Sequence, residues 1–540
     1  MSLISMEFLL FVGIAAVGYY LIPKQYQWIW LLIFSYIYYA SSGVKLLFFL
    51  LYTTIITYGT GRLLEWIDCN QANSKEEKKR RKARKKAILT GCLVLNFGML
   101  AVLKYTNFVV ENINAVFHTG ISFQMLLLPL GISFYTFQSM GYIIDVYWGK
   151  CKAEHNFFRF ALFVSFFPQI LQGPIGRYHR LAEQLYAEHR FDLINIENAL
   201  QLILWGFFKK LVLADRASVV VNQVFLNYTQ YSGVTNIVAV LMYSIQLYMD
   251  FSGGMDVVTG VASLFGIELD QNFRRPYFAT SITDFWHRWH ITLGTWMKDY
   301  IFYPISLSKW MGKFGKWTKK VFGKKTGRVL PICVANIIVF LVVGIWHGAA
   351  WKYIAYGFYN GLIIAISSLL APVYKKGFAF FHIDPKSKCW HVIQILRTFL
   401  LVNISWYFDM AVSLSAAWAM MKSTVTGFTL QTLSDGTIMS LGLDRLDYAI
   451  LAMGCLVVFL ISVLQERGVK IRESLGQKPL ILRWAVYGML VFCIPMFGCV
   501  MDTAGGFIYA QFKKNEKILV ENRNNVSLYN SQKVLYNTIN

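Results

Sequence analysis

Two histidines of this 540-residue sequence lie where an imidazole can act as an acid or a base. His347 lies in GIWHGAAW, between the apolar runs 332–343 and 353–370, and His290 lies in RWHITL. A neutral imidazole has an unperturbed pKa of ~6.5, which suits proton transfer near neutral pH. The small residues around His347 favour a cavity over lipid. A hydrogen-bonded core histidine is the alternative interpretation.

A second histidine, His287, precedes His290 by three residues. On a continuous helix this spacing puts both on one face, where two imidazoles can ligate a metal. No third-ligand pattern such as HExxH accompanies them, so we predict no metal site. The alternative is an interfacial helix anchored by Trp286, Trp289 and Trp296.

Acidic residues also occur inside apolar sequence, where a central charge costs about 2.5–3.5 kcal/mol. Asp250 and Asp256 flank a glycine pair in YMDFSGGMDVVTG. Six residues separate them, which is off-register for one helix face unless the glycines break the helix. The alternative is small-residue packing, with each aspartate paired or capping locally. The proline- and glycine-rich segment 167–178 predicts either a tunnel lining or a plain re-entrant turn.

The elements that carry these residues read as membrane helices. The sequence is 56% hydrophobic and 15% charged, with a mean hydropathy of +0.45, which predicts a polytopic membrane protein. The candidate spans are 6–22, 26–41, 44–64, 87–110, 123–147, 156–175, 198–225, 233–266, 329–347, 351–373, 392–410, 447–465 and 481–501.

The net charge of +23 is concentrated in two segments, 75–86 and 312–328. We interpret both as cytoplasmic loops that obey the positive-inside bias and contact anionic lipid headgroups, and not as nucleic-acid sites. An even number of crossings must then separate them, although five candidates do. The interrupted segment 156–175 is the first candidate for a segment that does not cross, and 198–225 is the second.

Eight isolated cysteines predict free thiols, without a disulfide framework. The first apolar segment lacks a basic n-region, and we expect it to be a retained helix. We predict one membrane domain over 1–510, with a connecting block at 267–328, an extramembrane stretch at 411–446 and a polar C-terminal tail at 511–540.

These motifs resemble those of the membrane-bound O-acyltransferases, and within that family the bacterial proteins of alginate and other exopolysaccharide O-acetylation. The resemblance covers nearly the whole chain, and DFWxRWHxxL followed by WHGAxW is its most specific part. It is also carried by YYLIPKQYQWIWLLIFSYIYYA, KYTNFVVENIN, LPLGISFYTFQSMGYIIDVYWGK, FALFVSFFPQILQGPIGRY, MDFSGGMDVVTGVASLFGIEL, NFRRPY, KDYIFYPI and GGFIYAQF.

The resemblance implies an all-α fold of about 11–13 hydrophobic helices in a ring around a central tunnel. It implies catalytic roles for His347 and His290, and carries no role onto His287. Gln172 and Gly254 replace residue types usual in the family, which bears on the tunnel lining. The predicted substrate- or tunnel-lining residues are Trp346, Trp351, Asp250, Asp256, Asn272, Arg275, Trp286, Arg288, Trp289 and Gln172.

By resemblance, the function is transfer of an acetyl group from cytosolic acetyl-CoA for O-acetylation of an extracellular polysaccharide. A separate extracytoplasmic acetyltransferase protein would complete the transfer, and the chain would lie in the bacterial plasma membrane without a bound cofactor. The absence of a GxSxG motif argues against a serine nucleophile. The alternatives are D-alanyl transfer from a carrier protein to teichoic acid and a transporter or channel.

Overall fold

The apolar runs of the sequence fold into helices, which satisfy every backbone polar group internally. The computed structural model describes residues 1–69, 74–124 and 126–499. Within these residues the extended pairing is limited to an isolated antiparallel bridge between Phe273 and Trp289. The all-α prediction is therefore confirmed, while the ring around a tunnel stays a prediction. The predicted tail at 511–540 and the segment GGFIYAQF lie outside the described residues.

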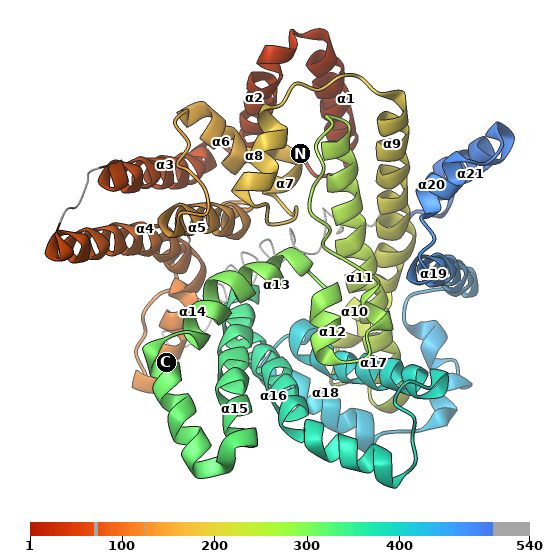
Figure 1. The fold of residues 1–540 in the computed structure, drawn as a ribbon. Helices are drawn as coiled ribbons and strands as arrows, with labels where there is room; N and C mark the ends of the chain where they lie inside the picture. Colours follow the sequence, from red (N-terminus) through yellow and green to blue (C-terminus); the bar gives the residue numbers. More distant parts are fainter. Residues whose placement is uncertain (70–73, 125, 500–540) are drawn as a thin grey trace, which may run out of the picture. The chain divides into compact units, whose positions relative to one another are not determined.

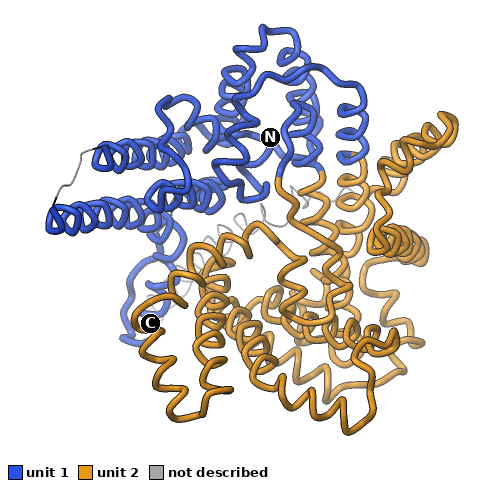
Figure 2. The backbone as a smooth tube through the Cα atoms, viewed as in Figure 1, with its two compact units in different colours: residues 1–203, 257–269, 502–540 blue, residues 204–256, 270–501 orange. Residues whose placement is uncertain are grey.

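The chain divides into two compact units, coloured separately in Figure 2. Of the described residues, unit 1 comprises 1–203 and 257–269, and unit 2 comprises 204–256 and 270–499. The helices that begin in unit 1 are α1 (Met6–Leu21), α2 (Gln27–Ala40), α3 (Leu47–Cys69), α4 (Lys75–Phe117), α5 (Ile132–Trp148), α6 (Phe157–Ser165), α7 (Phe167–Ile170), α8 (Tyr178–Tyr186) and α9 (Leu193–Phe207) (Figure 1).

Unit 2 contains the motif histidines and most of the long helices. Its elements are the π-helix η3 (Phe208–Ala214), α10 (Asp215–Leu226), α11 (Gly233–Ser263, whose last residues belong to unit 1), α12 (Ile282–Arg288), α13 (Ile291–Met297), the π-helix η5 (Lys298–Phe302), α14 (Tyr303–Ser306), α15 (Lys309–His347), α16 (Trp351–Phe380), α17 (Lys388–Met410), α18 (Leu414–Thr426), α19 (Arg445–Glu466), α20 (Ile471–Gly476) and α21 (Leu480–Phe497).

Seven helices of the described residues are long and apolar enough to cross a membrane. The multi-pass prediction is therefore confirmed, while several other predicted spans form shorter helices such as α1 and α2. The seven are the segment Val44–Cys69 that contains α3, together with α4, α11, α15, α16, α19 and α21.

The two basic segments, which were predicted to be cytoplasmic loops, are helical, and the side of the membrane that they face stays a prediction. Residues 75–86 form the first turns of α4, which begins with a capping box made by Ser74 and Glu77. The basic part of α15 is also helical, and the chain reverses at Gly323, whose φ of 76° lies in the left-handed region. Thr318 then donates to the carbonyl of Gly327 at 2.8 Å, which closes a helical hairpin. Lysine and arginine are good helix formers, so neither run of positive charge prevents a helix.

The predicted interruption in segment 156–175 is confirmed. α6 ends at Ser165, Phe166 has a non-helical ψ of 110°, and α7 carries Pro168 in its first turn. A break in a buried helix frees backbone carbonyls that need donors. The amide of Gln138 donates to the Phe163 carbonyl at 2.6 Å, and that of Gln169 donates to the Pro174 carbonyl at 2.6 Å. Buried glutamine side chains thus make the break tolerable.

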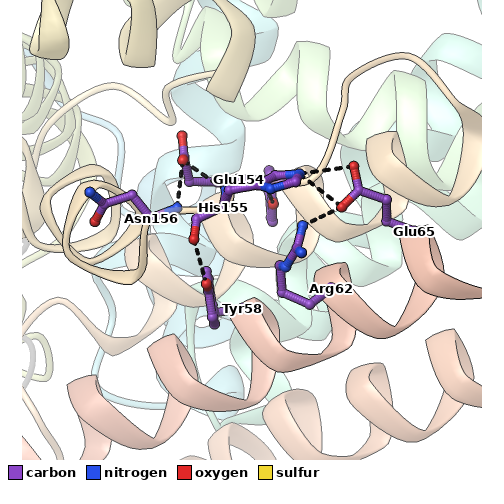
Figure 3. A network of polar contacts seen from close by, with 7 residues as sticks. Tyr58, Arg62, Glu65, Glu154, His155 and Asn156 are labelled. Atoms are coloured by element: carbon purple, nitrogen blue, oxygen red, sulfur yellow. Dashed lines mark hydrogen bonds and ion pairs between the residues drawn. The ribbon is translucent and has the colours of Figure 1, made fainter.

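A polar network in unit 1 fixes the loop between α5 and α6 against α3 (Figure 3). Glu65 pairs with Arg62 on its own helix and with the imidazole of His155, whose Nε2 lies 3.0 Å from Oε2. The hydroxyl of Tyr58 donates to the His155 carbonyl at 2.7 Å. Glu154 accepts from the backbone amides of the two residues that follow it. This histidine therefore has a structural role in holding a loop.

The glycine pair of α11 does not break the helix. The suggestion that these glycines interrupt the helix between Asp250 and Asp256 is therefore wrong. α11 runs continuously from Gly233 to Ser263. A Cβ on Gly253 would lie 2.8 Å from the carbonyl oxygen of Gly206. The glycine therefore permits close helix packing, as the small-residue alternative predicted.

Candidate active site

The first motif histidine, His290, lies between two helices and not within one. α12 ends at Arg288, Trp289 is extended, and His290 has φ 46° and ψ 52°. The predicted shared face of His287 and His290 is therefore wrong: His287 is exposed, whereas His290 is only 2% exposed. A left-handed conformation costs a non-glycine residue roughly 1–2 kcal/mol. Such strain is common at functional sites.

Asn272 holds the imidazole of His290. Its Oδ1 lies 3.2 Å from Nδ1 of His290 and accepts from both the backbone amide and the hydroxyl of Thr292, at 3.0 and 2.9 Å. The carbonyl of Asn272 accepts from the amide of Ile291 at 3.0 Å. Because a backbone N–H can only donate, the atom facing it is the amide oxygen, and Nδ1 of His290 carries a proton. Nε2 is then the nitrogen with the lone pair.

The burial of His290 decides its charge. Burial lowers the pKa of this imidazole to about 3, and the nearby charge of His347 lowers it further in the same direction. His290 is therefore neutral at physiological pH. A neutral, oriented imidazole can accept a proton or a hydrogen bond at Nε2, as an acyl-transfer site requires.

The second motif histidine, His347, is the last residue of α15. Close packing of α15 against α16 fixes it, because a Cβ on Gly344 would lie 2.2 Å from the Tyr353 carbonyl oxygen. The imidazole lies between two tyrosine rings of α16, with ring centroids 6.3 Å from Tyr353 and 5.2 Å from Tyr356. Its Nδ1 is 3.9 Å from Oδ1 of Asp409, at the end of α17.

Trp346 joins the two histidines into one site. Its ring centroid lies 5.6 Å from that of His290 and 5.1 Å from that of His347. The ring of Phe251, from α11, covers another side of His290 at 5.0 Å. The two sequence motifs thus converge within unit 2, and aromatic rings pack against both imidazoles.

Three other tryptophans, in and beside the motif that contains His290, were proposed as interfacial anchors. Trp289 and Trp296 are buried, and Trp289 packs against Phe285 and Trp406 with centroids 5.5 and 5.7 Å away. Trp286 donates to the side-chain oxygen of Asn360 at 3.2 Å. The anchor interpretation is therefore wrong for Trp289 and Trp296, which pack inside the protein.

The two aspartates of α11 are paired with lysines of the π-helix η3. Lys210 lies 2.6 Å from Asp250 and 2.8 Å from Asp215, and Lys209 lies 2.7 Å from Asp256. The local-pairing alternative is therefore confirmed for both. Buried charges need such partners, because removing a lone one from water costs several kcal/mol. A role in substrate binding stays a prediction.

The two predicted arginines are also held in ion pairs. Arg275 binds Glu466 on α19, and Arg288 binds the same carboxylate at 2.9 Å and Asp284 at 3.0 Å. Arg275 has a left-handed backbone, with φ 47°. The pairs tie the motif loop to α19. Their role toward substrate stays a prediction.

The two remaining predicted lining residues differ in exposure. Trp351 is 55% exposed at the start of α16. Gln172, in unit 1, is buried next to the break after α7. Within the described residues, no group of three or more metal-ligating side chains occurs.

Sequence reasoning missed Asp409, Tyr243 and Lys352. The hydroxyl of Tyr243 donates to Oδ2 of Asp409 at 2.7 Å, and Lys352 donates to the carbonyls of Asp409 and Ala411 at 2.9 and 2.7 Å. One signal was available: Asp409 is the single carboxylate in the predicted span 392–410. An intramembrane acid of this kind is a site candidate by default.

Comparison with known proteins agrees with the motif resemblance. Residues 152–317 match the membrane-bound O-acyltransferase family. The chain is 32% identical to a probable alginate O-acetylase, AlgI, of Pseudomonas aeruginosa over 462 residues, which are 84% of this chain and 81% of the relative. It is 30% identical to a peptidoglycan O-acetyltransferase of Helicobacter pylori over 448 residues, 77% and 78% of the two chains.

A more distant match is a teichoic acid D-alanyltransferase of Bacillus subtilis, which is 29% identical over 288 residues, 52% of this chain and 68% of the relative. The matches with the proteins named for O-acetylation of alginate and of peptidoglycan extend over most of the chain. This chain, a multi-pass membrane O-acyltransferase, therefore belongs to the membrane-bound O-acyltransferase family.

Proposed function

We propose that this chain transfers an acetyl group from cytosolic acetyl-CoA for the O-acetylation of an extracellular polysaccharide. The relatives that cover most of the chain support this, because they are named for O-acetylation of alginate and of peptidoglycan. The basic helix starts at 75–86 and 312–328 supply positive charge that attracts the phosphates of the donor.

The observation that carries the proposal is the convergence of His290 and His347 on the ring of Trp346. In the proposed step, His347 removes the proton from the acceptor hydroxyl as its oxygen attacks the thioester carbonyl carbon. The carbon–sulfur bond breaks, and the departing thiolate takes the proton back from His347. A positioned base of this kind contributes about 10²–10⁴-fold to the rate.

His290 has a different proposed role. Its Nδ1 donates a hydrogen bond to Oδ1 of Asn272, and its burial disfavours a positive charge. It therefore orients the acyl group or hands on a proton at Nε2 without becoming a stable cation. The buried tryptophans limit hydrolysis of the thioester by excluding water.

The alternative acyl transfer is that of D-alanine to teichoic acid. The match with the Bacillus subtilis protein supports this alternative, and it covers 52% of the chain. The longer matches with O-acetyltransferring relatives favour acetyl transfer. The transporter or channel alternative is not supported, since the chain belongs to an acyltransferase family.

The test is the acetyl content of extracellular polysaccharide in the native host, with the gene deleted and restored. Base treatment releases O-acetyl groups, which are then quantified. We expect deletion to remove them, the wild-type gene to restore them and His347→Ala to fail at normal membrane abundance. Unchanged acetyl content with loss of alanyl esters from teichoic acid would favour the alternative. Activity of His347→Ala would contradict the assigned base.

A further inference from the structure

Asp409 is a buried carboxylate that the acyl-transfer scheme does not yet use. It lies at the end of α17, and its side chain is 3% exposed. Its Oδ1 has no hydrogen-bond donor among the described residues, yet it faces Nδ1 of His347 at 3.9 Å. Leaving a buried acceptor without a donor costs about 1–3 kcal/mol. A shift of the imidazole by about 1 Å would make this bond, and catalytic hydrogen bonds often tighten only when substrate binds.

The surroundings of Asp409 orient it toward His347. The hydroxyl of Tyr243, from α11, donates to the opposite oxygen, Oδ2, at 2.7 Å. Lys352, from α16, donates to the carbonyls of Asp409 and Ala411 and fixes the end of α17. With Oδ2 occupied and the backbone held, Oδ1 is the oxygen directed at the imidazole.

Several titratable or charged groups face this pair from the packed elements. Lys352 interacts electrostatically with Asp409, and His290 is neutral. Tyr243 is a hydrogen-bond donor, and Tyr356 contacts the imidazole through its ring. Asp409 is therefore the anionic group that faces Nδ1 of His347.

We propose that Asp409 is a positioning residue for His347, which it holds in the tautomer with Nδ1 protonated and Nε2 free to act as the base. This inference rests on the proposed function of His347. As His347 takes the proton of the acceptor hydroxyl at Nε2, the carboxylate stabilises the imidazolium through Nδ1–H. When the proton passes to the departing thiolate, the neutral tautomer is restored, so atoms and charges balance over the cycle.

The carboxylate also sets the pH dependence. An adjacent negative charge favours the protonated form of an imidazole. Replacing Asp409 by asparagine removes that charge while keeping an oxygen for Tyr243. We expect the acidic limb of the rate profile to move to lower pH, because the weaker base stays neutral further into acid. The rate at the plateau should fall by about 10²-fold, because tautomer and orientation are no longer fixed.

The experiment uses membranes from the native host that carry the full-length wild type, Asp409→Asn or His347→Ala. Labelled acetyl-CoA is added and polysaccharide-bound acetyl is counted from about pH 5 to about pH 8. Asp435→Asn, at an exposed carboxylate of the same unit, is the matched control and should behave as the wild type. Membrane abundance is measured for each variant.

The proposal predicts a lower plateau together with an acidic limb shifted to lower pH for Asp409→Asn. A profile that superimposes on the wild type, a uniform loss without a shifted limb, or a shift to higher pH would each overturn it. If His347→Ala were inactive while Asp409→Asn had the rate and pH profile of the wild type, this inference would be rejected and the proposed function would be retained. An active His347→Ala would reject the proposed base itself.

Discussion

At the scale of single residues, the motif resemblance singled out two histidines, and contacts between distant segments position them. The order RWHxxL and WHGAxW pointed to His290 and His347, and the structure places both beside Trp346. The same spacing wrongly put His287 and His290 on one helix face, because a left-handed residue interrupts the helix. Asn272 and Asp409 could not be predicted as partners, since side-chain contacts across the fold leave no local pattern in one sequence.

The contrast between the two neighbouring histidines gives a residue-scale prediction. His290→Ala should lose most acetylation, because Asn272 then orients no imidazole. His287→Gln should retain substantial activity, because its side chain is exposed and carries no motif role. Polysaccharide acetyl content is compared at equal membrane abundance. Equal loss in both variants would contradict the assignment and call for zinc analysis of the purified protein.

At the scale of elements, hydropathy predicted the long apolar helices. It did not predict that the basic segments beside them would also be helical. The sequence predicted 447–465 and 392–410, and α19 and α17 include them. It did not predict the hairpin within α15, because the lysines that lower hydropathy are also good helix formers. The turn requires Gly323 in a left-handed conformation. The segment contains several glycines, and the sequence does not show which of them forms the turn.

The lysines and arginines of residues 75–86 and 312–328 still predict which side of the membrane these two segments face. We expect the α4 start and the α15 hairpin to face the cytosol, because Lys and Arg are retained on that side. Single cysteines replace Lys79 and Lys320, both exposed, in a cysteine-free background. An impermeant thiol reagent should label them in opened vesicles but not in intact cells. Labelling of either position in intact cells would reject the prediction.

Glycines at the α15–α16 contact give a second element-scale prediction. A Cβ at Gly357 would lie 2.2 Å from the Phe340 carbonyl oxygen, whereas one at Gly377, on the same helix, would meet nothing within 4 Å. Gly357→Ala should therefore force the helices apart, move His347 and lower both abundance and activity. Gly377→Ala should leave both near wild type. Fluorescence of a C-terminal tag and acetyl content measure the two effects, and equal behaviour of the variants would contradict the packing argument.

At the scale of the whole molecule, composition alone predicted a polytopic membrane protein, and seven long apolar helices confirm it. The described residues form two compact units. The single membrane domain over 1–510 stays a prediction. Unit 2 contains both histidine motifs, Asp409 and their contacts. The sequence could not assign residues to units, since segment 257–269 leaves one unit and joins the other through long-range packing.

The dependence on a partner is a property of the whole molecule. We expect the purified chain, supplied with acetyl-CoA and polysaccharide, to transfer acetyl slowly or not at all. The reason is the motif resemblance, which implies that a separate extracytoplasmic protein completes the transfer to the polysaccharide. The assay follows labelled acetyl onto polysaccharide in detergent or liposomes, with and without an extracytoplasmic extract of the host. The extract should restore transfer by the wild type but not by His347→Ala. Rapid acetylation of polysaccharide by the single purified chain would show that no partner is needed.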